Sequence, residues 1–455
     1  MSLPLLPTLD ELLHPETQPT DVRARSRASA DPLDPIHLFD MHWRDPEGRV
    51  SHLALPRELT GTRATVVVLS GRHFPTGSHK VGPAYSCLRE RLVAGEITQD
   101  GSTLVFPSTG NYGIGGAWVG PRAGFRSLVV LPQDMSEERF EKIRAYGADI
   151  IATPGSESNV KEIYDKVGEL RKDPNNRILN QFEDFGNYRF HHHVTGGAAC
   201  ILAEELVAAG HGERVSAFVS AMGSAGTLAA ADRMRRDWPG MKTVAVEPIQ
   251  CPTLYNVGYG AHAIEGIGDK HVTWIHNVRA TDLLVCVDDN ACLEGLQLLQ
   301  EGRDTLQAEL GLDPAFLASM DGVFGISGVC NVLASIATAR HYGMGEGELI
   351  FTVATDGFDR YPSVLRRLDA TKGPMDAGRA RERLELFLGI SPTRTLEATM
   401  EVRRRWHNQK YFTWVEQQNR SLADLEELWE PETWLAEAAR VAELDRRTLE
   451  LRTPA

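Results

Sequence analysis

The sequence predicts an α/β protein in which parallel β-sheets are wound by helices on both faces. Between residues 64 and 354, short runs rich in β-branched residues alternate with longer stretches of helical period. This alternation is typical of parallel strands joined by crossover helices. A chain of 455 residues also exceeds one compact core of ordinary size, so we expect two or three structural units. The expected strands are 64–69, 103–106, 127–131, 150–153, 217–219, 243–246, 283–287 and 349–353.

One helix carries clear local start and stop signals. Ser136 offers a capping hydroxyl, and Glu137 and Glu138 place acidic groups in the first turn. Gly147 is suited to end the helix. The local signals therefore agree with the alternating pattern of the whole chain.

The two ends of the chain differ in composition from the middle. Residues 1–60 are rich in proline and charge, which predicts an extended arm with little regular structure. Residues 369–455 carry Arg, Glu, Leu and Ala at helical spacing, for example over 379–388 and 436–451, which predicts a helical C-terminal extension. The aromatic segment 411–418 is expected to pack at a dimer interface, with a lid over a pocket as the alternative.

Charge and cysteine content exclude several classes of function. The formal net charge of −14 provides no basic face for nucleic acid or an anionic membrane. Six dispersed cysteines without a CxxC pair indicate reduced thiols and neither a zinc ribbon nor a disulfide framework. The start of the chain does not fit a secretory signal, and no run is apolar enough to span a bilayer, so we expect a cytoplasmic protein. The histidines at 191–193 point in different directions on a helix, so no metal site is expected there.

Three glycine-rich loops each follow an expected strand and precede an expected helix, the place where open α/β sheets bind ligands. The third loop, Gly223-Ser224-Ala225-Gly226-Thr227, offers backbone amides and a helix start that suit a phosphate, although a tight turn alone would look the same. The second loop, Ser108-Thr109-Gly110-Asn111-Tyr112-Gly113, has the hydroxyls and small residues needed to wrap a carboxylate. It is not a dinucleotide fingerprint, because Trp118 occupies the last glycine position.

The first loop, Pro75-Thr76-Gly77-Ser78-His79-Lys80, ends in a single lysine at the head of an apolar helix. The three loops in this order resemble those of the fold type II pyridoxal phosphate enzymes, the group of cysteine synthase and cystathionine β-synthase. The resemblance implies that Lys80 forms the imine with pyridoxal 5′-phosphate. It also implies that the second loop holds the substrate carboxylate through Ser108, Thr109 and Gly110, that Asn111 meets the 3′-oxygen of the cofactor, and that residues 223–227 hold its phosphate.

Further segments fall in the order of that family between about residues 74 and 361. The resemblance of 180–183 to an NQFEN segment implies that Gln181 faces the substrate carboxylate. Gly357 stands where the family usually has a serine beside the pyridine nitrogen, so Thr355 is expected to take that place. Asp356 is the alternative partner, or it caps the turn at Gly357 through its own backbone.

The resemblance also implies a domain organisation. A large cofactor-binding domain is expected to comprise residues 61–99 plus 211–368, and a small substrate-binding domain residues 100–210. The arm of residues 1–60 and the extension of residues 369–455 lie outside the resemblance. A homodimer is expected from the family and from the apolar content of these two ends.

The implied activity is pyridoxal-phosphate-dependent β-elimination or β-replacement on a small amino acid, by a lyase or a β-replacing synthase. Lys80 would first hold the cofactor and then, as a free amine, remove the α-proton. A serine or threonine dehydratase is an alternative, because it shares the same loops. An alternative of another class is a catalytically silent protein that binds the cofactor and a partner. His79 before the lysine and Val81-Gly82-Pro83 after it depart from cysteine synthases, so the reactants stay open.

Overall fold

The computed structural model describes residues 5–99, 101–108, 110–155 and 160–452. Its larger sheet has seven strands in the order β1-β2-β10-β7-β8-β9-β11, and the five inner strands are parallel. The short edge strands β1 and β11 each run antiparallel to their neighbour. These strands are β1 (His52–Leu55), β2 (Thr65–Ser70), β7 (Arg214–Ala221), β8 (Lys242–Pro248), β9 (Leu283–Val287), β10 (Glu348–Ala354) and β11 (Thr395–Glu397).

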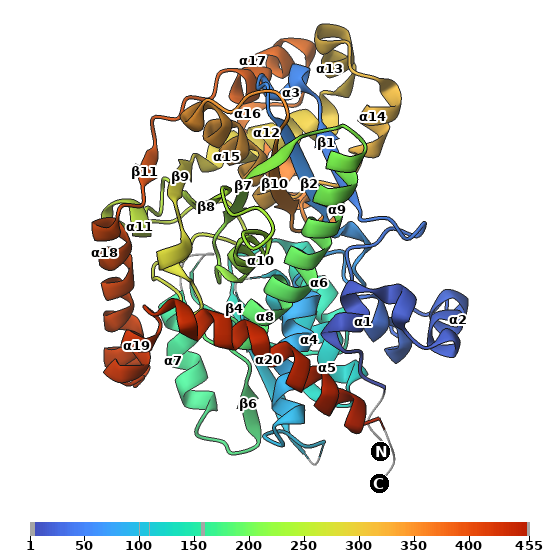
Figure 1. The fold of residues 1–455 in the computed structure, drawn as a ribbon, viewed down its shortest axis with the longest axis vertical. Coiled ribbons are helices and arrows are strands. Elements are labelled where there is room, and N and C mark those ends of the chain that lie inside the picture. Colours follow the sequence, from blue (N-terminus) through green and yellow to red (C-terminus); the bar gives the residue numbers. More distant parts are fainter. Residues whose placement is uncertain (1–4, 100, 109, 156–159, 453–455) are drawn as a thin grey trace.

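The smaller sheet is entirely parallel and has the order β5-β4-β3-β6. In Figure 1 the labelled strands β4 and β6 of this sheet lie below the strands of the larger sheet, and the two sheets have no strand in common. The strands are β3 (Thr103–Pro107), β4 (Arg126–Pro132), β5 (Asp149–Thr153) and β6 (Asn176–Ile178).

Helices cover both faces of the larger sheet. Along β2, Val66 and Val68 join one hydrophobic cluster, whereas Val67 and Leu69 join another. Successive side chains of a strand point to opposite faces, so both faces of this sheet are buried. The predicted α/β class with parallel sheets is therefore confirmed.

The helices are α1 (Leu9–Leu13), α2 (Thr20–Ala28), α3 (Arg57–Thr60), α4 (Val81–Val93), α5 (Asn111–Arg122), α6 (Glu137–Ala145), α7 (Val160–Leu170), α8 (Phe185–Phe190), α9 (Gly196–Ala208), α10 (Ala229–Met234), α11 (Thr253–Asn256), α12 (Asp289–Glu301), α13 (Arg303–Leu310), α14 (Pro314–Ser319), α15 (Ile326–Tyr342), α16 (Pro362–Lys372), α17 (Ala377–Leu388), α18 (Met400–Lys410), α19 (Leu422–Glu427) and α20 (Pro431–Glu450). Within the described ranges, none of them is long and apolar enough to cross a bilayer.

All eight expected strands are present, within one to three residues of the predicted ends. Helix α6 also begins where predicted, after Ser136. The predicted capping bond is wrong, however, because the Ser136 hydroxyl donates instead to Glu265 Oε2 at 3.0 Å. The bond to the buried Glu265 carboxylate orients the hydroxyl into the interior, where its oxygen accepts from no amide of the first turn.

The prediction of an extended N-terminal arm is wrong for the described part of that segment. Helices α1 and α2 form there, and Leu6, Leu9 and Leu12 are buried in the main hydrophobic cluster. A capping box between Thr8 and Glu11 starts α1 despite the nearby prolines. Burial of the leucines on one helical face outweighs the proline content of the segment.

The predicted C-terminal helices form, but they are not a detached appendix. Strand β11 joins the larger sheet, and α20 crosses the lower part of the molecule and ends beside α1 (Figure 1). Arg452 donates to the Leu6 carbonyl at 2.8 Å and to Glu11 Oε1 at 2.9 Å. The first and last described parts of the chain are thus joined to each other.

Candidate active site

Lys80 lies immediately before α4, beside the third glycine-rich loop. Its side chain is buried, and Nζ donates to the Ser224 hydroxyl at 3.3 Å. Its backbone amide donates to the Ser78 hydroxyl at 3.3 Å, which fixes the turn. Burial lowers the pKa of Lys80 to about 8, although the charge of Asp269 opposes this shift. About a tenth of the amine is therefore neutral and nucleophilic at pH 7, far more than for an ordinary lysine.

Arg360 holds the first loop in place. Its side chain is completely buried, and it donates to the carbonyls of Thr76 and Gly77, the latter at 3.3 Å. Gly77 has φ +69°, and a Cβ there would meet the Arg360 guanidinium at 3.3 Å, so glycine suits both the turn and the close approach. An arginine after β10 therefore positions the loop that ends in Lys80.

The third loop, Gly223 to Thr227, has the form of an anion cradle. Ala225 adopts the left-handed conformation at φ 61°, which turns the chain into the following helix. The amides of Ser224 and Ala225 donate to no described residue, although both residues are buried. Unpaired buried amides at a helix start are the groups that bind phosphate, so this loop fits a phosphorylated cofactor.

Asn187 on α8 supports that cradle and was not predicted from the sequence. Its Nδ2 donates to the Ser224 hydroxyl and to the Gln181 carbonyl, both at 2.9 Å. A Cβ on Gly226 would overlap Asn187 Oδ1, so the two residues fit only with glycine at 226. Asn187 thus ties the third loop to the segment of Gln181.

We expect Gly226→Ala to weaken pyridoxal phosphate binding by roughly tenfold to a hundredfold, because relieving this overlap costs about 1–3 kcal/mol. The measurement is a cofactor titration followed by absorbance. Gly240→Ala is the matched control, since a Cβ there meets nothing within 4 Å. Equal affinities in the two variants would contradict the role of the third loop.

The second loop is shaped by Ser108. Its hydroxyl accepts from the amides of Gly110 at 3.0 Å and Gly113 at 2.9 Å. The guanidinium of Arg139 lies so close to Gly110 that a Cβ would overlap it. Thr109, expected to contact the substrate carboxylate, lies outside the described residues.

Asn111 belongs to a buried polar network between the two sheets. Its Nδ2 donates to Asp356 Oδ2 at 2.6 Å, and its Oδ1 accepts from Arg139 at 3.2 Å. Arg139 also donates to Glu265 at 2.5 Å and to the Tyr361 hydroxyl at 3.0 Å. Among the described residues, one hydrogen of the Asn111 side-chain amide has no acceptor, so the residue still has a donor for a ligand oxygen.

Asp356 does not cap the turn at Gly357 through its own backbone, so that interpretation is wrong. Besides the Asn111 amide, its Oδ2 accepts from the Tyr361 hydroxyl at 2.8 Å, while Oδ1 has no hydrogen-bond partner in the described part of the chain. The Thr355 carbonyl accepts from the His79 amide at 3.2 Å, and the Thr355 hydroxyl bonds to no residue that the structure describes. The strand end therefore presents an unused hydroxyl beside the first loop.

Gln181 is buried before α8, and only its backbone carbonyl takes part in a recorded hydrogen bond, the one from Asn187. Within the described ranges its side-chain amide is available to a ligand. A long polar side chain that is buried and unused is expected where a polar ligand completes the site.

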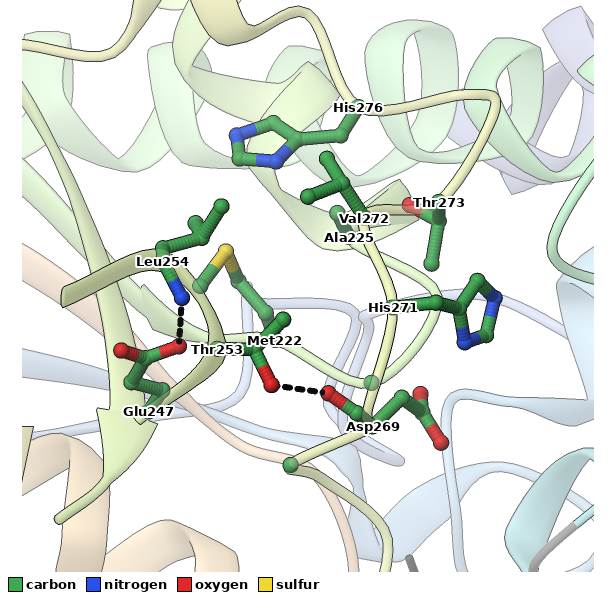
Figure 2. Close-up of a pocket in the computed structure, with 12 residues that line it drawn as sticks. Met222, Ala225, Glu247, Thr253, Leu254, Asp269, His271, Val272, Thr273 and His276 are labelled. Atoms are coloured by element: carbon green, nitrogen blue, oxygen red, sulfur yellow. Dashed lines mark hydrogen bonds between the residues drawn. The ribbon is translucent and has the colours of Figure 1, made fainter. Parts of the chain in front are cut away.

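Asp269, which was not predicted, lies in a cavity beside the third loop that Gly223, Ala225 and Thr273 also line. Figure 2 shows its carboxylate pointing away from Thr253, whose hydroxyl donates to the Asp269 carbonyl at 2.9 Å. Burial raises the pKa of Asp269 to about 7, against the opposite effect of Lys80. Its position after Gly266-Ile267-Gly268 was a sequence signal that could have identified it.

The histidines at 191–193 point in different directions from a π-helical turn. His191 bonds to the Thr195 hydroxyl at 3.0 Å, His192 stacks on Tyr188, and His193 faces Asp10. The described residues include no group of three or more histidine, cysteine or acidic side chains placed to hold a metal ion.

The aromatic segment around Trp414 packs within its own chain. Trp414 is buried, donates to the Val272 carbonyl at 2.8 Å and lies against Trp274 and His271. Trp414 is therefore not available to a dimer interface, whereas the use of the rest of segment 411–418, in which Phe412 is exposed, stays a prediction. It supports the 269–276 segment, which forms one wall of the cavity in Figure 2.

Comparison with known proteins defines the class. The family model described as pyridoxal-phosphate dependent enzyme matches residues 47–306. The chain therefore belongs to the family of pyridoxal-phosphate dependent enzymes, and pyridoxal phosphate is its cofactor.

Individual relatives lie within the group that the loops resemble. Cysteine synthase of Staphylococcus aureus is 29% identical over 290 residues, which cover 64% of this chain and 84% of the relative. The solved O-acetylserine dependent cystathionine β-synthase of Helicobacter pylori is 25% identical, with a TM-score of 0.57 over 71% of this chain and 97% of that one. A hydrogen sulfide-producing enzyme of Fusobacterium nucleatum is also 25% identical, with a TM-score of 0.58 over 70% of this chain and 88% of that one.

Proposed function

We propose that this enzyme catalyses β-elimination or β-replacement on a small amino acid. The observation that carries the proposal is the burial of Lys80 beside the anion cradle, with its Nζ donating to Ser224 of that loop. The similarity to cysteine synthase and to a cystathionine β-synthase supports the same reaction type.

Residues 223–227 would hold the phosphate of the cofactor, Asn111 its 3′-oxygen and Thr355 its pyridine nitrogen. Lys80 would bind its aldehyde carbon. When bound, pyridoxal phosphate supplies the electron sink that makes the α-proton of an amino acid acidic. The free amine of Lys80 would then accept that proton at Nζ.

The substrate carboxylate would be held by the second loop and by Gln181. The hydroxyl hydrogen of Ser108 supplies a donor, since the oxygen of that hydroxyl accepts from the Gly110 amide, and the Gln181 side-chain amide supplies another. Contacts at the carboxylate fix the rotation of the substrate about its Cα–N bond and so select the bond that breaks. We also propose Thr109 as part of this contact.

The test is to mix the purified holoenzyme with L-serine, L-cysteine, O-acetyl-L-serine and β-chloro-L-alanine while following the visible absorbance of the cofactor. We expect at least one of them to change the spectrum and to lose its β-substituent. Release of a keto acid and ammonia would indicate elimination, and a new β-substituted amino acid after addition of a thiol would indicate replacement. A chain that binds cofactor but turns over none of the four would contradict the proposal.

We propose that the enzyme works as a homodimer in the cytoplasm. All six cysteines are unpaired and buried, which suits a reducing compartment. Phe412, Leu422 and Leu435 leave apolar surface exposed on the C-terminal helices. Light scattering of the holoenzyme should give about twice the mass of one chain, and a monomeric mass would contradict the dimer.

We also propose the division into a large domain of residues 61–99 plus 211–368 and a small domain of residues 100–210. The four strands of the smaller sheet all fall within the second range. Helix α4, which spans residues 81–93, contacts α5 and α8 from the small-domain range, so it is expected to follow that domain in any relative movement.

A further inference from the structure

Four buried carboxylates surround the three loops, and they differ in their partners. Glu247 accepts from the amides of Leu254 at 3.0 Å and Tyr255 at 2.9 Å. Glu265 is paired with Arg139, and Asp356 accepts from Asn111 and Tyr361. Asp269 differs from these three, because neither of its oxygens has a hydrogen-bond partner among the described residues.

An unpartnered buried carboxylate is costly, since it loses its hydration without gaining hydrogen bonds. Asp269 is only 7% exposed, and its carboxylate is close enough to Lys80 for the two charges to affect each other's pKa. Such a group is expected where a ligand or a reacting atom supplies the missing partner. The side chain therefore has the position of a second acid–base group beside the lysine.

Besides Lys80, three further titratable groups lie near Asp269, namely His271, Tyr164 and Cys251. Burial lowers the pKa of His271 to about 4, so this imidazole is neutral, and it shares a hydrogen bond with the Tyr164 hydroxyl at 3.1 Å. Burial also raises the pKa of Tyr164 and of the Cys251 thiol, so both stay protonated. The positive charge that acts on Asp269 is that of Lys80.

Building on the proposed function, we propose that Asp269 is a catalytic residue that protonates the group leaving the β-carbon. The substrate class that needs such a proton is an amino acid whose β-hydroxyl departs as water or whose β-thiol departs as hydrogen sulfide, such as serine or cysteine. An acyloxy group on the β-carbon departs as a carboxylate, and a halogen departs as a halide. Both are stable anions, so neither needs a proton.

The proton balance closes within the site. The Cα–H proton passes to the Lys80 amine, the Cβ–X bond breaks with its electron pair on X, and X takes the proton of the Asp269 carboxylic acid and departs as HX. Asp269 is left as a carboxylate, and in elimination the Lys80 ammonium returns its proton to that carboxylate as the product leaves. In replacement, the incoming nucleophile gives its proton to this carboxylate as it bonds to Cβ, and the Lys80 ammonium returns a proton to Cα.

The test compares two leaving groups in Asp269→Asn. We expect turnover of L-serine or L-cysteine, whichever the wild type uses, to fall by about 10²–10⁴-fold, while turnover of β-chloro-L-alanine changes by less than about threefold. Asparagine has nearly the shape of aspartate and no charge to bury, so the variant should fold. Asp269→Ala should give the same contrast between substrates. Agreement of the two variants would show that the effect comes from loss of the acidic proton and not from a change in side-chain shape.

Glu247→Gln is the matched control, because burial also raises the pKa of this carboxyl to about 7 but its oxygens are occupied by backbone amides. Its turnover of each of the two substrates should equal that of the wild type. Equal loss on both substrates in Asp269→Asn, or no loss on either, would overturn the role of Asp269. A wild type that turns over neither L-serine nor L-cysteine would also overturn the role of Asp269, and one that turns over none of the four amino acids named above would overturn the proposed function instead.

Discussion

Lys80→Ala is expected to abolish the visible absorbance of the lysine-bound cofactor and to lower turnover by roughly 10³-fold, because the variant loses both the attachment point and the proton acceptor. The third loop is untouched, so phosphate binding should persist. The measurements are the absorbance spectrum, a cofactor titration and the initial rate on an active amino acid. Folding should be retained, as judged by circular dichroism.

A second buried lysine provides the control. Burial lowers the pKa of Lys410 to about 7, but its Nζ donates to the carbonyls of Trp274 at 2.9 Å and His276 at 2.8 Å. Lys410→Met should keep the visible absorbance and lose stability. Borohydride reduction of the holoenzyme should label the peptide of Lys80, and label on Lys410 would contradict the assignment.

Asp445→Ala is expected to destabilise the enzyme by about 3–5 kcal/mol, because it leaves the buried Arg89 guanidinium without its carboxylate. Asp445 also accepts from the amides of Leu9 at 3.0 Å and Asp10 at 3.1 Å, so α1 should loosen. The free energy of unfolding from urea titration is the measurement.

Glu443→Ala is the control, because Glu443 lies two residues away on α20 and pairs with Arg446 on the surface. Its loss should change the free energy of unfolding by less than about 1 kcal/mol. If the two variants unfold at the same urea concentration, then the buried contact does not stabilise the end of the chain as described.

Much of the fold could be predicted because the eight long strands carry their pattern locally. Strands β1, β6 and β11 were missed because they have only three or four residues, and their neighbours in the sheet determine them. The N-terminal arm was mispredicted because proline content is a local signal, whereas the burial of Leu9 and Leu12 depends on distant partners.

In the candidate site too, residues in contiguous motifs could be predicted from the sequence, whereas residues that act through distant contacts could not. Lys80 and the third loop stand in contiguous motifs that the sequence shows directly. Asn187 and Arg360 act through contacts that only the folded chain creates, with Ser224 and with the carbonyls of Thr76 and Gly77. No local pattern specifies such a contact, because the partners are 37 or more residues apart.

The joining of α1 to the end of α20 has a consequence for biosynthesis. At about 5–20 residues per second, a ribosome needs roughly 20–90 s to make this chain. During nearly all of that time Asp445 and Arg452 have not yet been synthesised. Helix α1, which is made first, therefore lacks these two partners. The leucines of α1 are therefore expected to remain a target for chaperones until the last helix leaves the exit tunnel.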